Sequence, residues 1–182
     1  MHVDRTGVIS AARLCLSPNQ DDRPDGESIH LLVIHAISLP PGEFGGGEVE
    51  ALFSNSLDCS GHPYFEQLRG LHVSAHFFIR RDGELIQFVP CGRRAWHAGN
   101  SAWNGRERCN DFSIGVELEG TDTQPFAEPQ YFVLAKLALA LKERYPIRDI
   151  VGHADIAPGR KTDPGPLFDW SHLRGLLEIR SS

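Results

Sequence analysis

The chain contains 182 residues, of which 41% are hydrophobic and 23% charged, a composition typical of a globular protein with a core of its own. We therefore expect a single domain over residues 1–182. The formal net charge of -6 argues against a general affinity for nucleic acid or for an anionic membrane surface.

The sequence shows no targeting or membrane-spanning pattern. The amino terminus, MHVDRTGVIS, lacks the basic region and apolar run of a secretory signal. The most apolar window, residues 132–141, contains Lys136 and is too short to cross a bilayer. We therefore expect a cytoplasmic protein. Its cysteines are widely spaced and include no Cys-x-x-Cys pair, so nitrogen and oxygen atoms should hold any metal.

The first part of the chain contains one strong element. Residues 1–29 are polar and rich in turn formers, which predicts an irregular lead-in. Residues 31–37 (LLVIHAI) form an apolar run typical of a buried central strand, and His35 is its only polar residue. A loop rich in Pro and Gly follows, and residues 48–53 are expected to form a short helix.

The later part of the chain contains both strands and helices. An Asp-Gly pair separates two strand-like runs, residues 73–80 and 84–89, and this pattern predicts a hairpin. The remaining expected elements are, in order, a strand at residues 112–118, a helix at 128–145, a short strand at 150–153 and an amphipathic helix at 169–179.

The stretch GHADIAPGRKTDPGP, residues 152–166, places titratable side chains between glycines and prolines, which predicts a shaped loop that carries a site. His153 and Asp163 from this loop, with His35 from the central strand, form a candidate zinc set. Three such ligands leave one position for a water, whose pKa zinc lowers to about 7. Because the chain has 9 histidines, spacing alone leaves a chance combination open.

Two further groups are candidates for catalysis. Lys161 lies two residues before Asp163, so in an extended segment both side chains point the same way and the lysine would stabilise an oxyanion. Glu117, near the end of an apolar strand, would be costly to bury without a partner or a role, and a carboxylate beside a metal-bound water would orient that water and carry its proton. The alternatives are a solvated surface lysine and a solvent-facing strand end. Strand alternation does not separate Glu117 from Glu119.

Aromatic residues suggest a groove. Trp96 and His97 in AWHAG, with Tyr64 in HPYF, would line a groove for a sugar and a peptide, or would belong to the core. We interpret His76 as a core histidine.

Six fragments follow one another across roughly residues 6–175: LLVIHAISLPPGEFGG, HPYF, VSAHFFIRRDGELIQFVP, RAWHAG, GRERCNDFSIGVELEGTD and GHADIAPGRKTDPGP. Together they resemble the AmpD amidases, which are N-acetylmuramoyl-L-alanine amidases of type 2 and are related to peptidoglycan recognition proteins. The resemblance implies an α/β fold of the α+β type, with a mixed central β-sheet flanked by helices and a groove that leads to zinc.

The implied activity is that of a zinc amidase. It would cleave the amide between 1,6-anhydro-N-acetylmuramic acid and the L-alanine of the stem peptide in cytoplasmic peptidoglycan recycling, and so lower the level of muropeptides that induce β-lactamase. By the same resemblance, Zn²⁺ would be held by His35, His153 and Asp163. Glu117 would orient or deprotonate the zinc-bound water, and Lys161 would stabilise the oxyanion.

Substrate contacts are implied less directly. Tyr64, Trp96 and Arg108 would border the groove, and Arg108 would pair with a stem-peptide carboxylate. Ala36 follows His35 where relatives have Asn, and His72 stands where some relatives have Arg. Both departures concern muropeptide contacts and leave the metal set complete.

Two other functions remain open at this stage. A recognition module would bind a muropeptide without cutting it, and a zinc hydrolase of another kind would act on an unrelated amide or ester. The complete ligand set, with Glu117 and Lys161, favours the amidase. The expected partner is the small muropeptide substrate, bound by a monomer.

Overall fold

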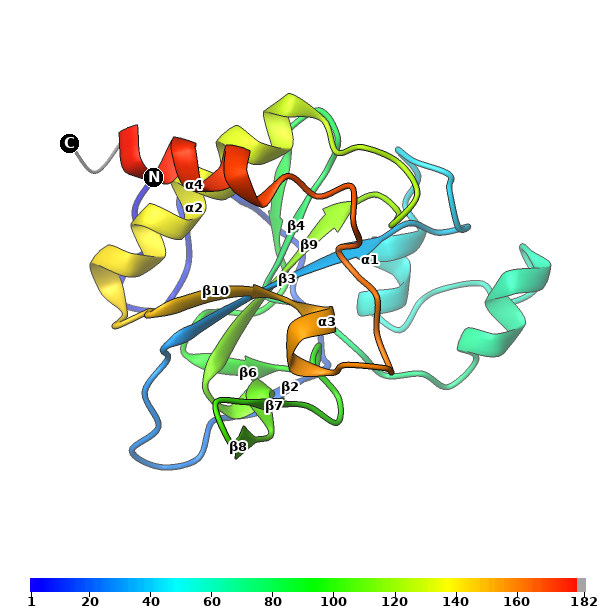
Figure 1. Cartoon of the computed structure of the whole chain (residues 1–182). Coiled ribbons are helices and arrows are strands. Elements are labelled where there is room, and N and C mark those ends of the chain that lie inside the picture. The colour runs from blue at the N-terminus through cyan, green and yellow to red at the C-terminus, as the bar shows by residue number, and fades with distance from the viewer. Residues whose placement is uncertain (180–182) are drawn as a thin grey trace.

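Six strands form one mixed sheet at the centre of the computed structural model, which describes residues 1–179 (Figure 1). The order of strands across the sheet is β1-β5-β4-β9-β3-β10. β4 and β5 pair antiparallel, whereas the other neighbouring strands pair in parallel. The strands are β1 (Arg13–Leu14), β3 (Leu31–Ile37), β4 (Phe77–Ile79), β5 (Leu85–Gln87), β9 (Ser113–Glu119) and β10 (Asp149–Gly152). The expected mixed central sheet is thus confirmed.

The central strand β3 is covered on both faces. Leu32 and Ile34 join one hydrophobic cluster together with Ile114 of β9, whereas Leu31 and Val33 belong to a cluster on the opposite face. A strand buried on both faces favours apolar residues at every position, which explains why LLVI does not alternate with polar residues. His35 falls on the same face as Leu31 and Val33 because successive side chains of a strand alternate.

Helices flank the sheet, as Figure 1 shows. α2 (Glu128–Arg144) and α4 (Trp170–Ile179) pack together, and Leu134 and Leu173 join the core on that face. In a separate cluster, Phe53 of α1 (Glu48–Phe53) packs edge-on against Phe88, with ring centroids 5.0 Å apart. The expected helices at 48–53, 128–145 and 169–179 are confirmed to within a residue at each described end. No helix of residues 1–179 is both long and apolar enough to cross a membrane.

The hairpin predicted from Asp82 and Gly83 is present, because β4 and β5 are antiparallel neighbours. Gly83 has a φ of 92°, which favours glycine. The two strands of the hairpin are shorter than the runs of residues 73–80 and 84–89 that predicted them. The smaller elements are η1 (Pro63–Leu68), β7 (Ala102–Trp103), β8 (Arg106–Glu107) and η2 (Cys109–Asp111).

The expectation of an irregular lead-in over residues 1–29 is wrong in part. β1 extends the edge of the main sheet beside β5, and β2 (Gln20–Asp22) pairs antiparallel with β6 (Arg93–Ala95). The buried side chain of Gln87 accepts the N–H of Ile9 at 2.9 Å and donates to the carbonyl of Gly7 at 2.8 Å. Strands of two or three residues are too short for a periodic pattern, so only their long-range partners define them.

The segment of residues 152–166 is not a loop throughout. Gly152 ends β10, and a single helical turn, α3 (His153–Ile156), follows at once. The Asp155 carboxylate accepts the N–H of Gly152 at 2.7 Å, and this bond supports the start of the turn. The carbonyl of Asp163 accepts the N–H of Ala154 at 2.9 Å. The chain therefore folds back on α3 and returns Asp163 to His153.

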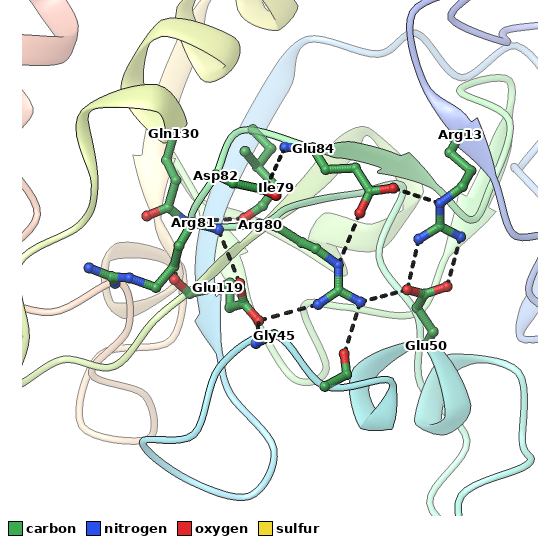
Figure 2. A network of polar contacts seen from close by, with 11 residues as sticks. Arg13, Gly45, Glu50, Ile79, Arg80, Arg81, Asp82, Glu84, Glu119 and Gln130 are labelled. Atoms are coloured by element: carbon green, nitrogen blue, oxygen red, sulfur yellow. Dashed lines mark hydrogen bonds and ion pairs between the residues drawn. The ribbon is translucent and has the colours of Figure 1, made fainter.

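A polar network joins the edge of the sheet to α1 (Figure 2). The Arg80 guanidinium donates to Glu50 at 2.7 Å and to Glu119 at 3.4 Å, and it also pairs with Glu84 at 3.1 Å. Glu50 accepts two further bonds from Arg13, at 2.8 and 2.9 Å. The network therefore ties β1, the hairpin, β9 and α1 to one another.

Glu50 predicts a pH dependence of stability. Hydrogen bonds from Arg13 and Arg80 lower its pKa from 4.5 to about 2. Because the folded pKa lies below the ordinary one, the stabilisation is present above about pH 4.5 and is lost as the pH falls toward 2. We expect Glu50→Gln to lower the free energy of unfolding by about 1 kcal/mol at pH 7, since the network is partly exposed. Urea denaturation at pH 7 and pH 3 measures the difference.

The matched control is Glu43→Gln, which removes an exposed carboxylate that lies outside this network. It should leave the free energy of unfolding unchanged at both pH values. An effect of Glu50→Gln that is as large at pH 3 as at pH 7 would contradict the ionic origin of the stabilisation.

Candidate active site

The carboxyl ends of three neighbouring parallel strands meet at one edge of the sheet. β3 and β9 pair in a register that places His35 directly beside Glu117. β10 pairs with β3 as far as Gly152, which lies beside Ile34, so His153 follows at the level of His35. Side chains from distant parts of the chain therefore gather at the carboxyl ends of these strands, which is where ligands bind in many sheets with parallel strands.

Three of the predicted residues converge there: His35, His153 and Asp163. The two imidazole Nδ1 atoms are 2.9 Å apart. Oδ2 of Asp163 lies 3.3 Å from Nδ1 of His35 and 3.1 Å from Nδ1 of His153. Ligands at the corners of a tetrahedral zinc site, with bonds of about 2.0–2.1 Å, lie about 3.3 Å apart. The spacing of the three atoms thus fits three corners of such a site.

The charge states also fit a metal. Burial lowers the pKa of His35 to about 4, so its imidazole is neutral at pH 7. Burial alone would raise the pKa of Asp163, but hydrogen bonds with His153 and His35 hold that pKa well below its ordinary value. The set therefore offers nitrogen and carboxylate oxygen ligands, a combination that zinc accepts. Within residues 1–179 this set contains no cysteine.

Glu117 faces this set from β9. Its Oε2 atom is buried and has no hydrogen-bond partner among residues 1–179. Burial raises the pKa of Glu117 well above 4.5, the charge of Asp163 raises it further, and Lys161 opposes both. A carboxyl group with a raised pKa beside a possible metal site is suited to take up and return a proton.

A cleft of about 460 Å³ opens over these side chains. Lys161 is exposed and lines the cleft together with its chain neighbours Arg160 and Thr162. Much of the remaining lining is apolar or aromatic. These residues are Ala36, Ile37, Leu39, Pro41, Leu52, Phe53, Tyr64, Leu68, Leu71, Val73 and Trp96. The cleft thus combines charged and apolar side chains, which suits a ligand of mixed polarity.

Arg108 lies outside this lining. It borders a separate depression that shares Trp96 with the cleft, and its Nε is 3.2 Å from the Asp111 carboxylate. Its side chain is 70% exposed, so the guanidinium remains accessible to a ligand that extends past Trp96. Ala36 lines the cleft, whereas His72 is exposed and does not.

Two further histidines, His76 and His97, have side chains that are buried or line the cleft. His76 is fully buried, which confirms that it belongs to the core. His97 lines the cleft and also lies 2.9 Å from His35, from its Nδ1 to Nε2 of His35. The sequence did not predict the contact between His97 and His35. The signal for it was Gly115, an isolated glycine inside the strand FSIGVEL, since such a glycine often marks the close approach of another group.

Comparison with known proteins agrees with this geometry. A family model described as N-acetylmuramoyl-L-alanine amidase matches residues 25–166. The chain belongs to this amidase family. It is therefore an enzyme that hydrolyses an amide bond.

Individual relatives are similar to this amidase in sequence and structure over nearly its whole length. The 1,6-anhydro-N-acetylmuramyl-L-alanine amidase AmpD of Citrobacter freundii is 56% identical over 173 residues, which cover 94% of this chain and 92% of that protein. A crystal structure of a selenomethionine derivative of AmpD superposes with a TM-score of 0.95 at 56% identity, covering 97% of this chain and 99% of the other.

A structure with a bound substrate is also similar. The N-acetylmuramyl-L-alanine amidase AmiD from E. coli, in complex with anhydro-N-acetylmuramic acid-L-Ala-D-gamma-Glu-L-Lys, superposes with a TM-score of 0.62 at 34% identity. The superposition covers 85% of this amidase and 60% of AmiD.

The buried carboxyl group of Glu117 predicts a gain in stability when it is removed. Because its folded pKa is raised, its ionised form destabilises the folded state as the pH rises above 4.5. We expect Glu117→Gln to raise the free energy of unfolding of the metal-free protein by about 1–2 kcal/mol at pH 8. At pH 4 the carboxyl group is protonated in the folded state, and the gain should be small.

Denaturant unfolding in the presence of a chelator measures this effect. Glu107→Gln serves as the control because Glu107 is exposed on β8, and it should change nothing. A loss of stability in Glu117→Gln at pH 8 would show that the ionised carboxylate is better accommodated than its surroundings suggest.

Proposed function

We propose that this amidase uses zinc to hydrolyse the amide between 1,6-anhydro-N-acetylmuramic acid and the L-alanine of a stem peptide. One observation carries the proposal: Nδ1 of His35, Nδ1 of His153 and Oδ2 of Asp163 lie within 3.3 Å of one another in the lining of a cleft. The choice of substrate rests on the similarity to AmpD and on the muropeptide in the AmiD complex.

Each side chain has a separate task in the proposed reaction. Zinc, when bound, supplies a Lewis acid and lowers the pKa of a coordinated water. The Glu117 carboxylate orients the attacking water and takes its proton as the new C–O bond forms. The Lys161 ammonium stabilises the negative charge that develops on the carbonyl oxygen. The protonated Glu117 then returns the proton to the alanine nitrogen as the C–N bond breaks.

The cleft suggests how the substrate is held. Tyr64 and Trp96 would contact the sugar and the first residues of the peptide, since both line the cleft. Arg108 would pair with a carboxylate further along the stem, beyond Trp96. In this proposal the enzyme acts as a monomer on recycled cell-wall fragments in the cytoplasm, and it lowers the level of muropeptides that induce β-lactamase.

The first experiment follows peptide release from anhydro-muramyl tripeptide by mass spectrometry. We expect the purified protein to release free tripeptide, to lose this activity after treatment with a chelator, and to regain it when zinc is restored. Tight binding of intact substrate without release would favour a recognition role instead. Release from unrelated amides at equal rates would favour a general hydrolase.

The proposed role of Lys161 predicts that removing its charge lowers turnover. Lys161→Met keeps the length of the side chain but removes its charge, and we expect kcat to fall by about 10²–10³ while zinc content stays the same. Lys136→Met, which removes an exposed lysine from α2, is the matched control. If Lys161→Met raised KM and left kcat unchanged, the lysine would bind the substrate equally in the ground state and the transition state.

A further inference from the structure

We infer that His97 is a positioning residue: it fixes the tautomer and the ring orientation of His35, so that Nδ1 of His35 presents a lone pair to the metal. The adjacent carbonyl of Ala98 does the same for His153. This inference rests on the proposed zinc site. It names the side chain and the carbonyl that hold the two imidazoles in the tautomer with the proton on Nε2 and the lone pair on Nδ1.

The contact between His97 and His35 is a hydrogen bond between two imidazoles. Nε2 of His35 lies 2.9 Å from Nδ1 of His97, and the rings meet nearly at right angles, with centroids 5.0 Å apart. On its other side, Nε2 of His97 lies 3.2 Å from Oγ of Ser113. His97 is therefore bonded at both ring nitrogens and is held between β3 and β9.

The position of each proton follows from these contacts. A neutral imidazole carries one N–H and one lone pair. If Nδ1 of His35 binds a metal, its proton sits on Nε2 and is donated to Nδ1 of His97. The proton of His97 then sits on Nε2 and is donated to Ser113 Oγ. The row of three side chains therefore has one consistent set of donors and acceptors.

For His153, the partner of Nε2 is a backbone carbonyl and not a side chain. Its Nε2 lies 3.3 Å from the carbonyl oxygen of Ala98, which accepts but does not donate. When Nδ1 of His153 binds the metal beside Asp163, the proton of the imidazole sits on Nε2 and is donated to this carbonyl. Arg160 donates to the same carbonyl at 2.7 Å and so fixes the position of that oxygen.

A single side chain fixes the backbone that supplies both partners. Oδ1 of Asn110 accepts the N–H of His97 at 3.1 Å and the N–H of Ala98 at 2.8 Å. Gly115 makes room for the ring, because a Cβ at this position would lie 2.4 Å from Cγ of His97. One dipeptide, His97–Ala98, thus holds the second nitrogen of both candidate imidazole ligands.

The test compares two replacements of His97. His97→Leu has a similar volume but no acceptor, whereas His97→Asn places its Oδ1 close to the position of the histidine Nδ1. Zinc affinity is measured by competition with a chromogenic chelator, and thermal unfolding of the metal-free proteins monitors the fold. We expect His97→Leu to bind zinc about 10–100-fold more weakly than the wild type. His97→Asn should retain most of the affinity.

A second measurement does not depend on any variant. In the zinc-loaded wild type labelled with ¹⁵N, NMR should detect a proton on Nε2 of His35 and a coupling across the hydrogen bond to Nδ1 of His97. A proton found on Nδ1 of His97 instead would overturn the inference. Equal zinc affinity in the wild type and His97→Leu would overturn it as well.

Failure of the inference is distinguishable from failure of the proposed function. If the wild type itself binds no zinc in the chelator competition, the zinc site is wrong and the role of His97 falls with it. If the wild type binds zinc and both replacements bind it equally well, the metal site stands and only the positioning role is lost.

Discussion

The parallel pairing of β3 with β9 and β10 is the constraint on which the site depends. Parallel strands bring their carboxyl ends to the same edge of a sheet, and the register of β3 with β9 sets His35 beside Glu117. A slip of one residue would turn Glu117 into the core on the side of α2 and break the arrangement. The hydrophobic clusters on both faces of β3 hold that register, so the stability of the core and the geometry of the site have one origin.

Environment, more than residue type, decides what the carboxylates do. Glu117 and Glu119 lie two residues apart on the same strand and face the same side of the sheet. Glu119 accepts hydrogen bonds from the N–H groups of Gly45 and Arg81 and pairs with Arg80, so it joins the network that holds the loop before α1. One oxygen of Glu117 has no hydrogen-bond partner within residues 1–179, and burial raises the pKa of this carboxyl group. One carboxylate is thus structural, and the other remains available for chemistry.

Local patterns predicted the strongest elements well. The apolar run of β3, the Asp-Gly hairpin and the apolar spacing of α2 each reflect interactions within a few residues, and each was visible in the sequence. β1 and β2 were missed because strands this short depend on partners more than 70 residues away. The turn α3 was missed because glycines and prolines around it resemble a loop, and only Asp155 marks its start.

The sequence by itself determined which chemical groups the site contains: two histidines, two carboxylates and a lysine, placed at strand ends or in a loop of glycines and prolines. Spacing alone left open which of 9 histidines meet, because it carries no information on pairing between strands, and the family resemblance was needed to select His35 and His153. Tertiary structure brought His35, His153 and Asp163 within 3.3 Å of one another, separated Glu117 from Glu119, and placed His97 behind His35. The physical reason is that these contacts are made across strands and loops, where burial and register, and not local propensity, set the distances.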